Sequence, residues 1–186
     1  MTILRSFFGV SAMQIRGFIA ASLDGYIARA DGAIDWLDEF GDVDYGYERF
    51  IEQVGTIVIG RRTYDQVLGF GDWVYQGLRT IVVSHRPVDD PPPDTEVWSG
   101  DISDLVAELR RSETRDVWVI GGADVQRQFL DAGGLDRIEV HVIPVLLGRG
   151  IPLWPPSELE HRVALNSATV LGKGMVRLDY GIRRPG

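Results

Sequence analysis

The sequence predicts an α/β fold of three layers, with helices on both faces of a mainly parallel sheet and antiparallel strands at its C-terminal edge. Short apolar runs alternate with segments of helical periodicity, as in strand–helix–strand units. Three of these runs, TIVI, TIVVS and VWVI, are apolar without alternation, which is typical of strands covered on both faces. Near the C-terminus only strand-like segments remain, and these predict the antiparallel edge.

The predicted strands are short apolar runs bounded by polar or glycine-containing segments. We expect six of them before the C-terminal segments, at Ile15–Ala21, Thr56–Ile59, Thr80–Ser84, Glu96–Trp98, Val117–Ile120 and Ile138–Val145. Between the third and the fourth lies Asp89–Pro93, whose consecutive prolines exclude a helix and a central strand. This segment is therefore expected to be a loop within one domain.

Four segments have the periodicity of amphipathic helices. Tyr47–Val54 carries apolar residues along one face, and Thr63–Leu68 is a shorter candidate. Ser103–Arg111 follows Asp101, a residue type suited to the N-cap of a helix. Ala123–Ala132 follows two glycines and again places apolar residues on one side. Helices in these positions would connect neighbouring parallel strands.

The C-terminal part of the chain predicts a β-hairpin. Arg162–Leu171 and Met175–Ile182 flank the three-residue turn Gly172-Lys173-Gly174. Together with Ile138–Val145, we place these strands at the edge of the sheet. Apolar edge strands need a cover.

Composition excludes several classes of function. The chain has 186 residues, of which 45% are hydrophobic and 25% charged, as expected of a single globular domain. Its formal net charge of −8 argues against a general nucleic-acid-binding protein. It contains no cysteine, and its three histidines, His85, His141 and His161, are too widely spaced to suggest a metal site. We therefore expect no disulfide, no thiolate chemistry and no bound metal.

The N-terminal residues are expected to lie outside the folded domain. Residues 1–12, MTILRSFFGVSA, contain one arginine and a brief apolar patch, too little for a signal peptide. We interpret them as a leader before a single domain of residues 13–186. No apolar run approaches the roughly 18 residues of a membrane span. We expect a cytoplasmic protein with neither a membrane nor a nucleic acid as partner.

Three predicted strands end in residues that suit a phosphate. Gly121-Gly122 lie between a strand and a helix, where backbone N–H groups and the helix dipole favour an anion, although such a junction is by itself often only a tight turn. Gly60-Arg61-Arg62-Thr63 and Ser84-His85-Arg86 follow two other strands. Each arginine alone reads as a surface residue. Their recurrence at equivalent strand ends favours a dinucleotide with an additional 2′-phosphate.

Six segments in order resemble the dihydrofolate-reductase-like superfamily, and most of all the reductase domain of the riboflavin-biosynthesis deaminase-reductase. The matching segments are Ile19–Ala28, Ala33–Leu37, Val58–Asp65, Thr80–Pro87, Val117–Leu130 and Val140–Trp154. The resemblance covers roughly residues 14–183. It implies a dihydrofolate-reductase-like fold and an oxidoreductase that uses NADPH.

The resemblance also assigns a cofactor site to these strand ends. Near the phosphates it implies Gly60, Arg61, Arg62, Thr63, Ser84, His85, Arg86, Gly121, Gly122, Ala123, Asp124 and Val125. Near the nicotinamide it implies Ala20, Ala21 and Ile27. In dihydrofolate reductases the glycine pair is joined by a cis peptide bond, so the same is expected of Gly121–Gly122.

The candidate catalytic and substrate-binding residues have alternative structural interpretations. Dihydrofolate reductases carry a carboxylate on their first helix, for which Asp44 is the candidate, but a solvated acidic loop that caps a helix is the simpler explanation of any one of these acidic residues. The SLDG motif, Ser22–Gly25, is similar to that of the riboflavin-pathway reductases and implies roles for Ser22, for Asp24 as a catalytic group and for Trp36 at the substrate. Asp24-Gly25 could instead be a turn, and Trp36 a core aromatic residue.

The leading hypothesis is thus an NADPH-dependent reductase of a small heterocyclic substrate, similar to 5-amino-6-(5-phosphoribosylamino)uracil reductase. The alternatives are a dihydrofolate reductase and a protein that binds NADPH or a related nucleotide without turnover. The resemblance further implies a homodimer that forms through the C-terminal strands.

Overall fold

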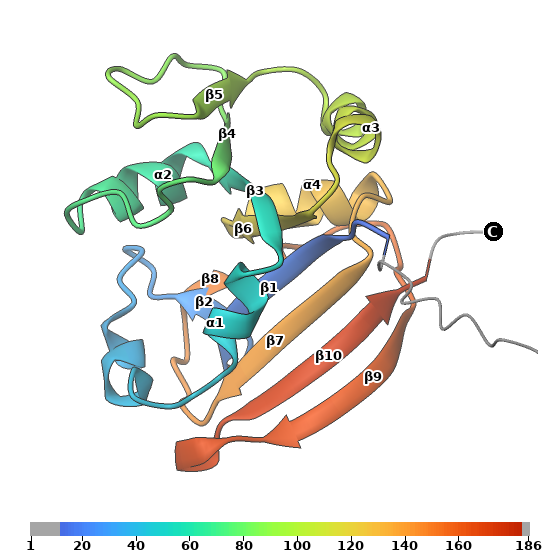
Figure 1. Ribbon diagram of the computed structural model, residues 1–186. Coiled ribbons are helices and arrows are strands. Elements are labelled where there is room, and N and C mark those ends of the chain that lie inside the picture. The colour runs from blue at the N-terminus through green and yellow to red at the C-terminus, as the bar shows by residue number, and fades with distance from the viewer. Residues whose placement is uncertain (1–11, 184–186) are drawn as a thin grey trace, which may run out of the picture.

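The fold is built on an eight-stranded sheet, shown in the computed structural model, which describes residues 12–183 (Figure 1). In spatial order its strands are β5 (Thr95–Trp98), β4 (Arg79–Val83), β3 (Val54–Gly60), β6 (Asp116–Gly121), β1 (Ile15–Ser22), β7 (Arg137–Ile143), β10 (Val176–Ile182) and β9 (Val163–Val170). Every pairing from β5 to β7 is parallel. The strand β10 is antiparallel to both β7 and β9, so the predicted mainly parallel sheet with an antiparallel edge is confirmed.

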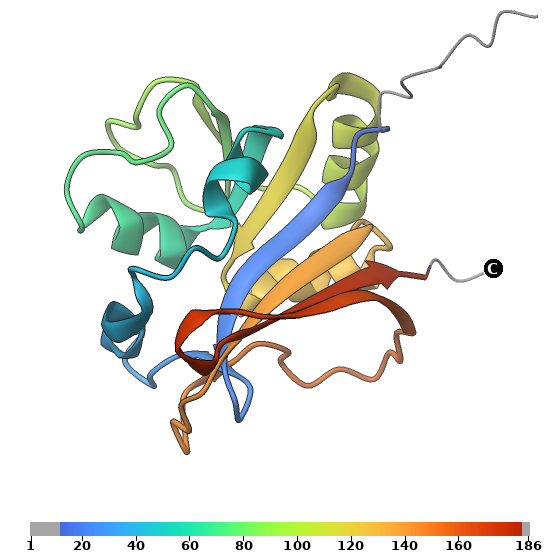
Figure 2. The same cartoon turned by 60° about the horizontal axis from the view of Figure 1, so that its bottom comes forward.

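Helices cover both faces of the parallel part (Figures 1 and 2). The short helix α1 (Tyr47–Ile51) and α2 (Arg61–Leu68) pack on one face, and α3 (Ile102–Ser112) and α4 (Ala123–Asp131) on the other. Along β3, Ile57 and Ile59 face α1 and α2. Val58 between them faces α3 and α4, which explains the unbroken apolar run of this strand. The predicted three-layer arrangement is confirmed.

One prediction about strand position is wrong. We expected Ile138–Val145 among the edge strands, but β7 pairs in parallel with β1 and lies inside the sheet. The reason is that α4 carries the chain back across the sheet, so that the next strand starts in the same direction as β1. Only β9 forms the C-terminal edge, joined to β10 by the turn η2 (Gly172–Gly174) at the predicted position.

Several short elements escape prediction. A 3-10 helix, η1 (Asp35–Phe40), precedes α1, and a separate two-stranded sheet pairs β2 (Tyr26–Ala28) with β8 (Ile151–Pro152). These elements are too short to show a period in the sequence. The helix α1 also ends earlier than expected, because Val54 already belongs to β3.

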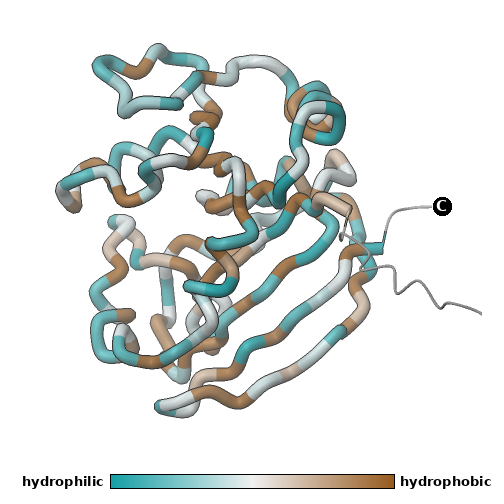
Figure 3. The backbone as a smooth tube through the Cα atoms, viewed as in Figure 1, coloured by the Kyte–Doolittle hydropathy of each residue, from teal (hydrophilic) through white to brown (hydrophobic). Residues whose placement is uncertain are grey.

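Apolar and polar residues alternate along β1, β7, β10 and β9, the strands towards the C-terminal edge of the sheet (Figure 3). On one face there, the buried guanidinium of Arg16 lies 2.8 Å from Asp116 and 2.5 Å from Glu139. Arg137 pairs with Asp179 at 2.8 Å. Buried charges in this region are therefore satisfied by opposite charges. Among residues 12–183, no helix is long and apolar enough to cross a membrane, and no group of three His, Asp or Glu side chains could hold a metal ion.

Candidate functional site

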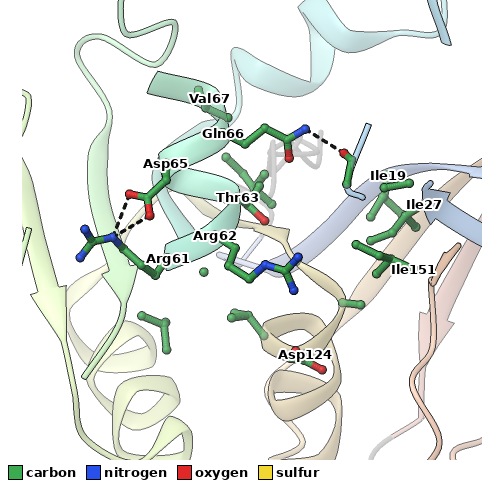
Figure 4. A pocket seen from close by; sticks show the side chains of 18 of the residues that line it. Ile19, Ile27, Arg61, Arg62, Thr63, Asp65, Gln66, Val67, Asp124 and Ile151 are labelled. Carbon is green, nitrogen blue, oxygen red and sulfur yellow. Dashed lines mark hydrogen bonds and ion pairs between the residues drawn. The ribbon is translucent and has the colours of Figure 1, made fainter. Parts of the chain in front are cut away.

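A large cavity of about 1110 Å³ opens at the carboxyl ends of β3, β4 and β6, with β1 at one side (Figure 4). Its wall contains the first residues of two helices, Gly60–Thr63 and Gly122–Val125, as well as Ser84 and His85 at the end of β4. The carboxyl ends of parallel strands are the usual ligand site of open α/β sheets. The structure thus brings three of the predicted segments to one place.

Two helix N-termini meet in this cavity. Gly60 precedes α2 and Gly122 precedes α4, and no side chain caps either helix. A Cβ atom on Gly60 would lie 3.0 Å from Cγ2 of Val125 and 3.4 Å from the backbone nitrogen of Gly122. Glycine at position 60 therefore permits the close approach of the two helix starts. Their combined N–H groups and dipoles favour an anion between them.

The turn between β6 and α4 depends on its glycines. The peptide bond between Gly121 and Gly122 is cis, as the resemblance implied. Gly121 has a φ of 127°, a conformation that residues with a side chain rarely adopt. This turn directs the chain from the end of β6 into the N-terminus of α4, next to the start of α2.

The two arginines of α2 differ in their surroundings. Nε of Arg61 lies 2.8 and 3.0 Å from the carboxylate oxygens of Asp65, and Nη1 donates to the carbonyl of Pro87 at 2.6 Å. Arg62 points into the cavity (Figure 4), and within residues 12–183 it makes no hydrogen bond or ion pair. Arg62 is therefore the guanidinium available to an anionic ligand.

Asp124 also lies on the cavity wall, in the first turn of α4. Its carboxylate would repel a phosphate, so only its backbone N–H group suits an anion. After β4, Ser84 and His85 line the cavity, but Arg86 does not. The backbone of Arg86 instead closes a turn, in which its N–H donates to the hydroxyl of Ser84 at 3.0 Å. The structure does not bring the Arg86 side chain to the predicted site.

The opposite end of the cavity is apolar. Ile19 and Ala20 of β1, Ile27 of β2 and Ile151 of β8 form its wall (Figure 4). Ala21 is not part of it, because it is buried in the apolar cluster around Val140. Sequence reasoning missed Ile19, the neighbour of Ala20. The reason is that the alternation of side chains along β1 does not tell which of its residues face the cavity. Ile151 lies in the matching segment Val140–Trp154, but nothing in that segment marked it as a site residue.

Asp24 and Ser22 stabilise a loop. They line neither the large cavity nor a smaller one beside it. The hydroxyl of Ser22 donates to the carboxylate of Asp24 at 2.6 Å, and the N–H groups of Leu147 and Gly148 donate to it at 3.1 and 2.7 Å. The Ser22 hydrogen bond, followed by these backbone donors, lowers the pKa of Asp24 below its usual value of 3.8. Ser22 also accepts the N–H of Tyr26 at 2.9 Å. The geometry favours the turn interpretation of this motif.

Asp44 and Trp36 lie outside both cavities as well. Asp44 is exposed and accepts the N–H of Gly46 at 2.9 Å within its own turn. Trp36 is buried against Phe40, Ile143 and Met175. Neither the carboxylate of Asp44 nor the indole of Trp36 therefore lines a cavity. A local turn holds Asp44, and packing in the core holds Trp36.

A second cavity of about 350 Å³ adjoins the first and shares Ile19, Ala20 and Leu37 with it. Its remaining wall consists of Phe18, Phe40, Gly41, Tyr45, Tyr47, Tyr75, Trp118, His141, Ile143 and Met175. We call it the aromatic cavity. None of its aromatic residues was singled out from the sequence, because they come from five separate segments that only the fold brings together.

Comparison with known proteins shows the family. The model of the RibD C-terminal domain matches residues 14–177, and the chain belongs to this family. The uncharacterized protein YwjB of Bacillus subtilis is 34% identical over 165 residues, which cover 88% of this chain and 94% of YwjB. The riboflavin biosynthesis protein RibD of Corynebacterium ammoniagenes is 28% identical over 71% of this chain, but this match spans only 43% of that protein.

Solved structures agree with the family. A protein of Shewanella sp. PV-4, provisionally named a riboflavin biosynthesis protein, has a TM-score of 0.83 and 30% identity, over 92% of this chain and 100% of that one. Dihydrofolate reductase of Enterococcus faecalis, solved with NADP(H), has a TM-score of 0.67 at 16% identity, over 93% and 99% of the two chains. The second likeness shows the fold alone, which is dihydrofolate-reductase-like as the sequence predicted.

Proposed function

We propose that this protein is an NADPH-dependent oxidoreductase that reduces a small heterocyclic substrate. The observation that carries the proposal is the pair of adjoining cavities. The larger cavity presents two helix N-termini and the guanidinium of Arg62, which has no partner in the described part of the chain, at its polar end. Its apolar end adjoins the aromatic cavity at Ile19 and Ala20. When bound, a reduced nicotinamide supplies a hydride, and the protein orients the two reactants.

The residues present fit a phosphorylated dinucleotide. Arg62 would bind a phosphate through its guanidinium, and the N–H groups at the starts of α2 and α4 would bind the pyrophosphate. Ser84 and His85 add a hydroxyl and an imidazole to the same wall. Ile19, Ala20 and Ile27 would hold the nicotinamide ring and exclude water from it. The E. faecalis reductase of the same fold was solved with NADP(H), which supports this assignment.

Family membership supports a reductase related to the riboflavin pathway. The RibD protein of Corynebacterium ammoniagenes, 28% identical over 71% of this chain, is named for riboflavin biosynthesis. A deaminase/5-amino-6-(5-phosphoribosylamino)uracil reductase of Thermotoga maritima shares the fold, with a TM-score of 0.70 at 15% identity over 92% of this chain and 57% of that one. Dihydrofolate reduction is a weaker candidate, because the aromatic cavity has no carboxylate on its wall. Binding of a nucleotide without turnover is the remaining alternative.

Titration of NADPH fluorescence, followed by assays of NADPH oxidation, tests the proposal. We expect saturable NADPH binding, and oxidation that depends on an added heterocyclic substrate. Failure of NADPH to bind would contradict the proposal. Binding without oxidation across pterin and pyrimidine substrates would favour the non-catalytic alternative.

We also propose that residues 13–186 form one domain and that two copies associate through β9. Val163, Leu165 and Val170 of this edge strand are apolar and exposed. Residues 1–11 of the expected leader lie outside the described residues. Light scattering at micromolar concentration should give the mass of a dimer, and the mass of a monomer would refute this association. A cytoplasmic location stays a prediction.

A further inference from the structure

The aromatic cavity has a wall without permanent charge. The thirteen residues among 12–183 that line it include no Asp, Glu, Lys or Arg. The ionisable groups that line it are three tyrosines and His141. A ligand that enters this cavity therefore meets rings and hydroxyl groups, and finds no ion-pair partner.

His141 is neutral in this setting. Only 2% of its surface is exposed, and burial lowers the pKa of its imidazole below the usual value of 6.5. Its Nε2 lies 3.1 Å from the carbonyl oxygen of Tyr45, to which the protonated ring nitrogen of the neutral tautomer can donate. His141 therefore holds the segment before α1 against β7 and adds no charge at pH 7.

The three tyrosine hydroxyls are unengaged. Tyr45, Tyr47 and Tyr75 line the cavity, and in the part of the chain that the structure describes none of their hydroxyl groups has a hydrogen-bond partner. Burial raises the pKa of each phenol. They remain protonated at physiological pH and offer neutral donors and acceptors to a ligand.

The aromatic rings that line the cavity pack against one another. Phe18 contacts several of the other rings. The centroid of its ring lies 4.5 Å from that of His141, 6.2 Å from that of Tyr45 and 6.3 Å from that of Trp118. Tyr75 meets Trp118 edge to face at 5.6 Å. Aromatic faces and edges at these separations favour contacts with a further flat ring.

Charge around the cavity also disfavours an anion. The segment 31–48, which supplies Leu37, Phe40 and Tyr45 to the wall, contains seven acidic residues and no Lys or Arg. A nearby cation, Arg177, is the β10 partner of His141 in the sheet, but its guanidinium lies against Gly46 and outside the wall. Two of the seven, Asp35 and Asp42, pair with Arg29 and Lys173, and the other five leave this segment with a negative charge that disfavours an anion nearby.

We propose that the aromatic cavity binds an uncharged planar ring system with hydrogen-bond acceptors on its rim, and rejects the same ring when a carboxylate is attached to it. As the substrate site of the reductase, this inference rests on the proposed function. A volume of about 350 Å³ suits a ligand of one or two rings, near the small end of ligand sites. An anion buried here would lose its hydration and, among the described residues, would find hydroxyl donors but no cation to pair with.

Two ligands of almost equal shape test the inference, namely 6-methylpterin and pterin-6-carboxylate. Their binding at pH 7 is measured by quenching of tryptophan fluorescence, for which Trp118 lies in the cavity wall, with and without NADP⁺. We expect 6-methylpterin to bind at least about 30-fold more tightly, because the carboxylate would be buried without a cation to offset its charge.

Variants locate the binding site. Tyr45→Phe, Tyr47→Phe and Tyr75→Phe each remove one hydroxyl and keep the ring, and we expect at least one to weaken 6-methylpterin about 5- to 10-fold. Tyr180→Phe is the matched control, because Tyr180 packs in a different cluster, against Val140 and Ile138. Leu37→Arg adds a cation where the two cavities meet and should strengthen pterin-6-carboxylate at least about 10-fold.

The inference is overturned if the carboxylate binds as well as the neutral pterin, if neither pterin binds, or if all three tyrosine variants behave like Tyr180→Phe. NADPH binding is measured separately through its own fluorescence. Loss of NADPH binding with retained selectivity between the pterins would refute the proposed function and leave the ligand class of this cavity intact. Normal NADPH binding without that selectivity would refute the ligand class alone.

Discussion

Replacement of Arg62 by alanine tests the polar end of the cofactor cavity directly. The guanidinium of Arg62 lies on the cavity wall without a partner in residues 12–183, whereas Arg61 is held by Asp65 and the carbonyl of Pro87. A bound phosphate would therefore gain its side-chain hydrogen bonds mainly from Arg62. Arg62→Ala removes these bonds and leaves the backbone N–H groups of α2 in place.

The expected loss follows from the charge of both groups. Hydrogen bonds to charged groups contribute about 1.5–3 kcal/mol. With about 1.4 kcal/mol per factor of ten, NADPH should bind about 10- to 150-fold more weakly to the variant. Arg111→Ala is the control, because it makes the same change in net charge at an exposed position of α3 outside both cavities. It should change NADPH binding less than about twofold, as expected of screened surface charges.

Titration of NADPH fluorescence at low and at high salt measures both variants. Wild-type binding should weaken as salt is added, and Arg62→Ala should show a smaller dependence on salt. Equal dissociation constants for wild type and Arg62→Ala would refute the assignment of this arginine to a phosphate. An equal loss in Arg111→Ala would show that only the net charge of the protein matters.

Three further outcomes are expected. Asp24→Asn should lower the melting temperature at pH 7, because the carboxylate accepts three hydrogen bonds. Its pKa is depressed, so this stabilisation is present above pH 3.8 and is lost as the pH falls through the lower folded-state pKa; lost turnover at an unchanged melting temperature would instead make Asp24 catalytic. Asp124→Asn should tighten NADPH binding severalfold in fluorescence titrations by removing a negative charge from the cavity wall, and weaker binding would contradict its repulsive role. Gly60→Ala should weaken NADPH binding and lower the melting temperature, since its Cβ would press on Val125 and separate the two helix starts; an unchanged protein would show that the contact relaxes freely.

Much of the fold could be predicted because its elements have local signatures. The apolar runs of β3, β4 and β6 and the glycines that follow two of them are visible in the sequence, and the structure places the ends of all three strands at one cavity. The residues Gly60–Thr63, Ser84, His85 and Gly122–Val125 could be grouped from sequence because parallel strands align their carboxyl ends. Arg86 was grouped with these residues but does not line the cavity. Its backbone forms a turn through hydrogen bonds with the hydroxyl of Ser84.

The aromatic cavity and the role of Asp24 could be found only in three dimensions. Asp24 binds backbone N–H groups 123 and 124 positions further along the chain. Phe18, Tyr47, Trp118 and His141 likewise come from β1, α1, β6 and β7. The periodicity of one segment indicates which of its faces is apolar, but it does not show which distant segment that face will contact.

The sequence alone determined the order and type of the main elements and the strand ends that suit a phosphate, because these depend on neighbouring residues. It also determined the acidic net charge, which depends on composition alone. Tertiary structure decided that β7 lies inside the sheet and that the aromatic cavity adjoins the larger one. It also decided that Arg61 is paired with Asp65, whereas the guanidinium of Arg62 has no partner within residues 12–183. The physical reason is the packing of side chains from remote strands, which selects one face and one partner for each residue from several that local propensity allows.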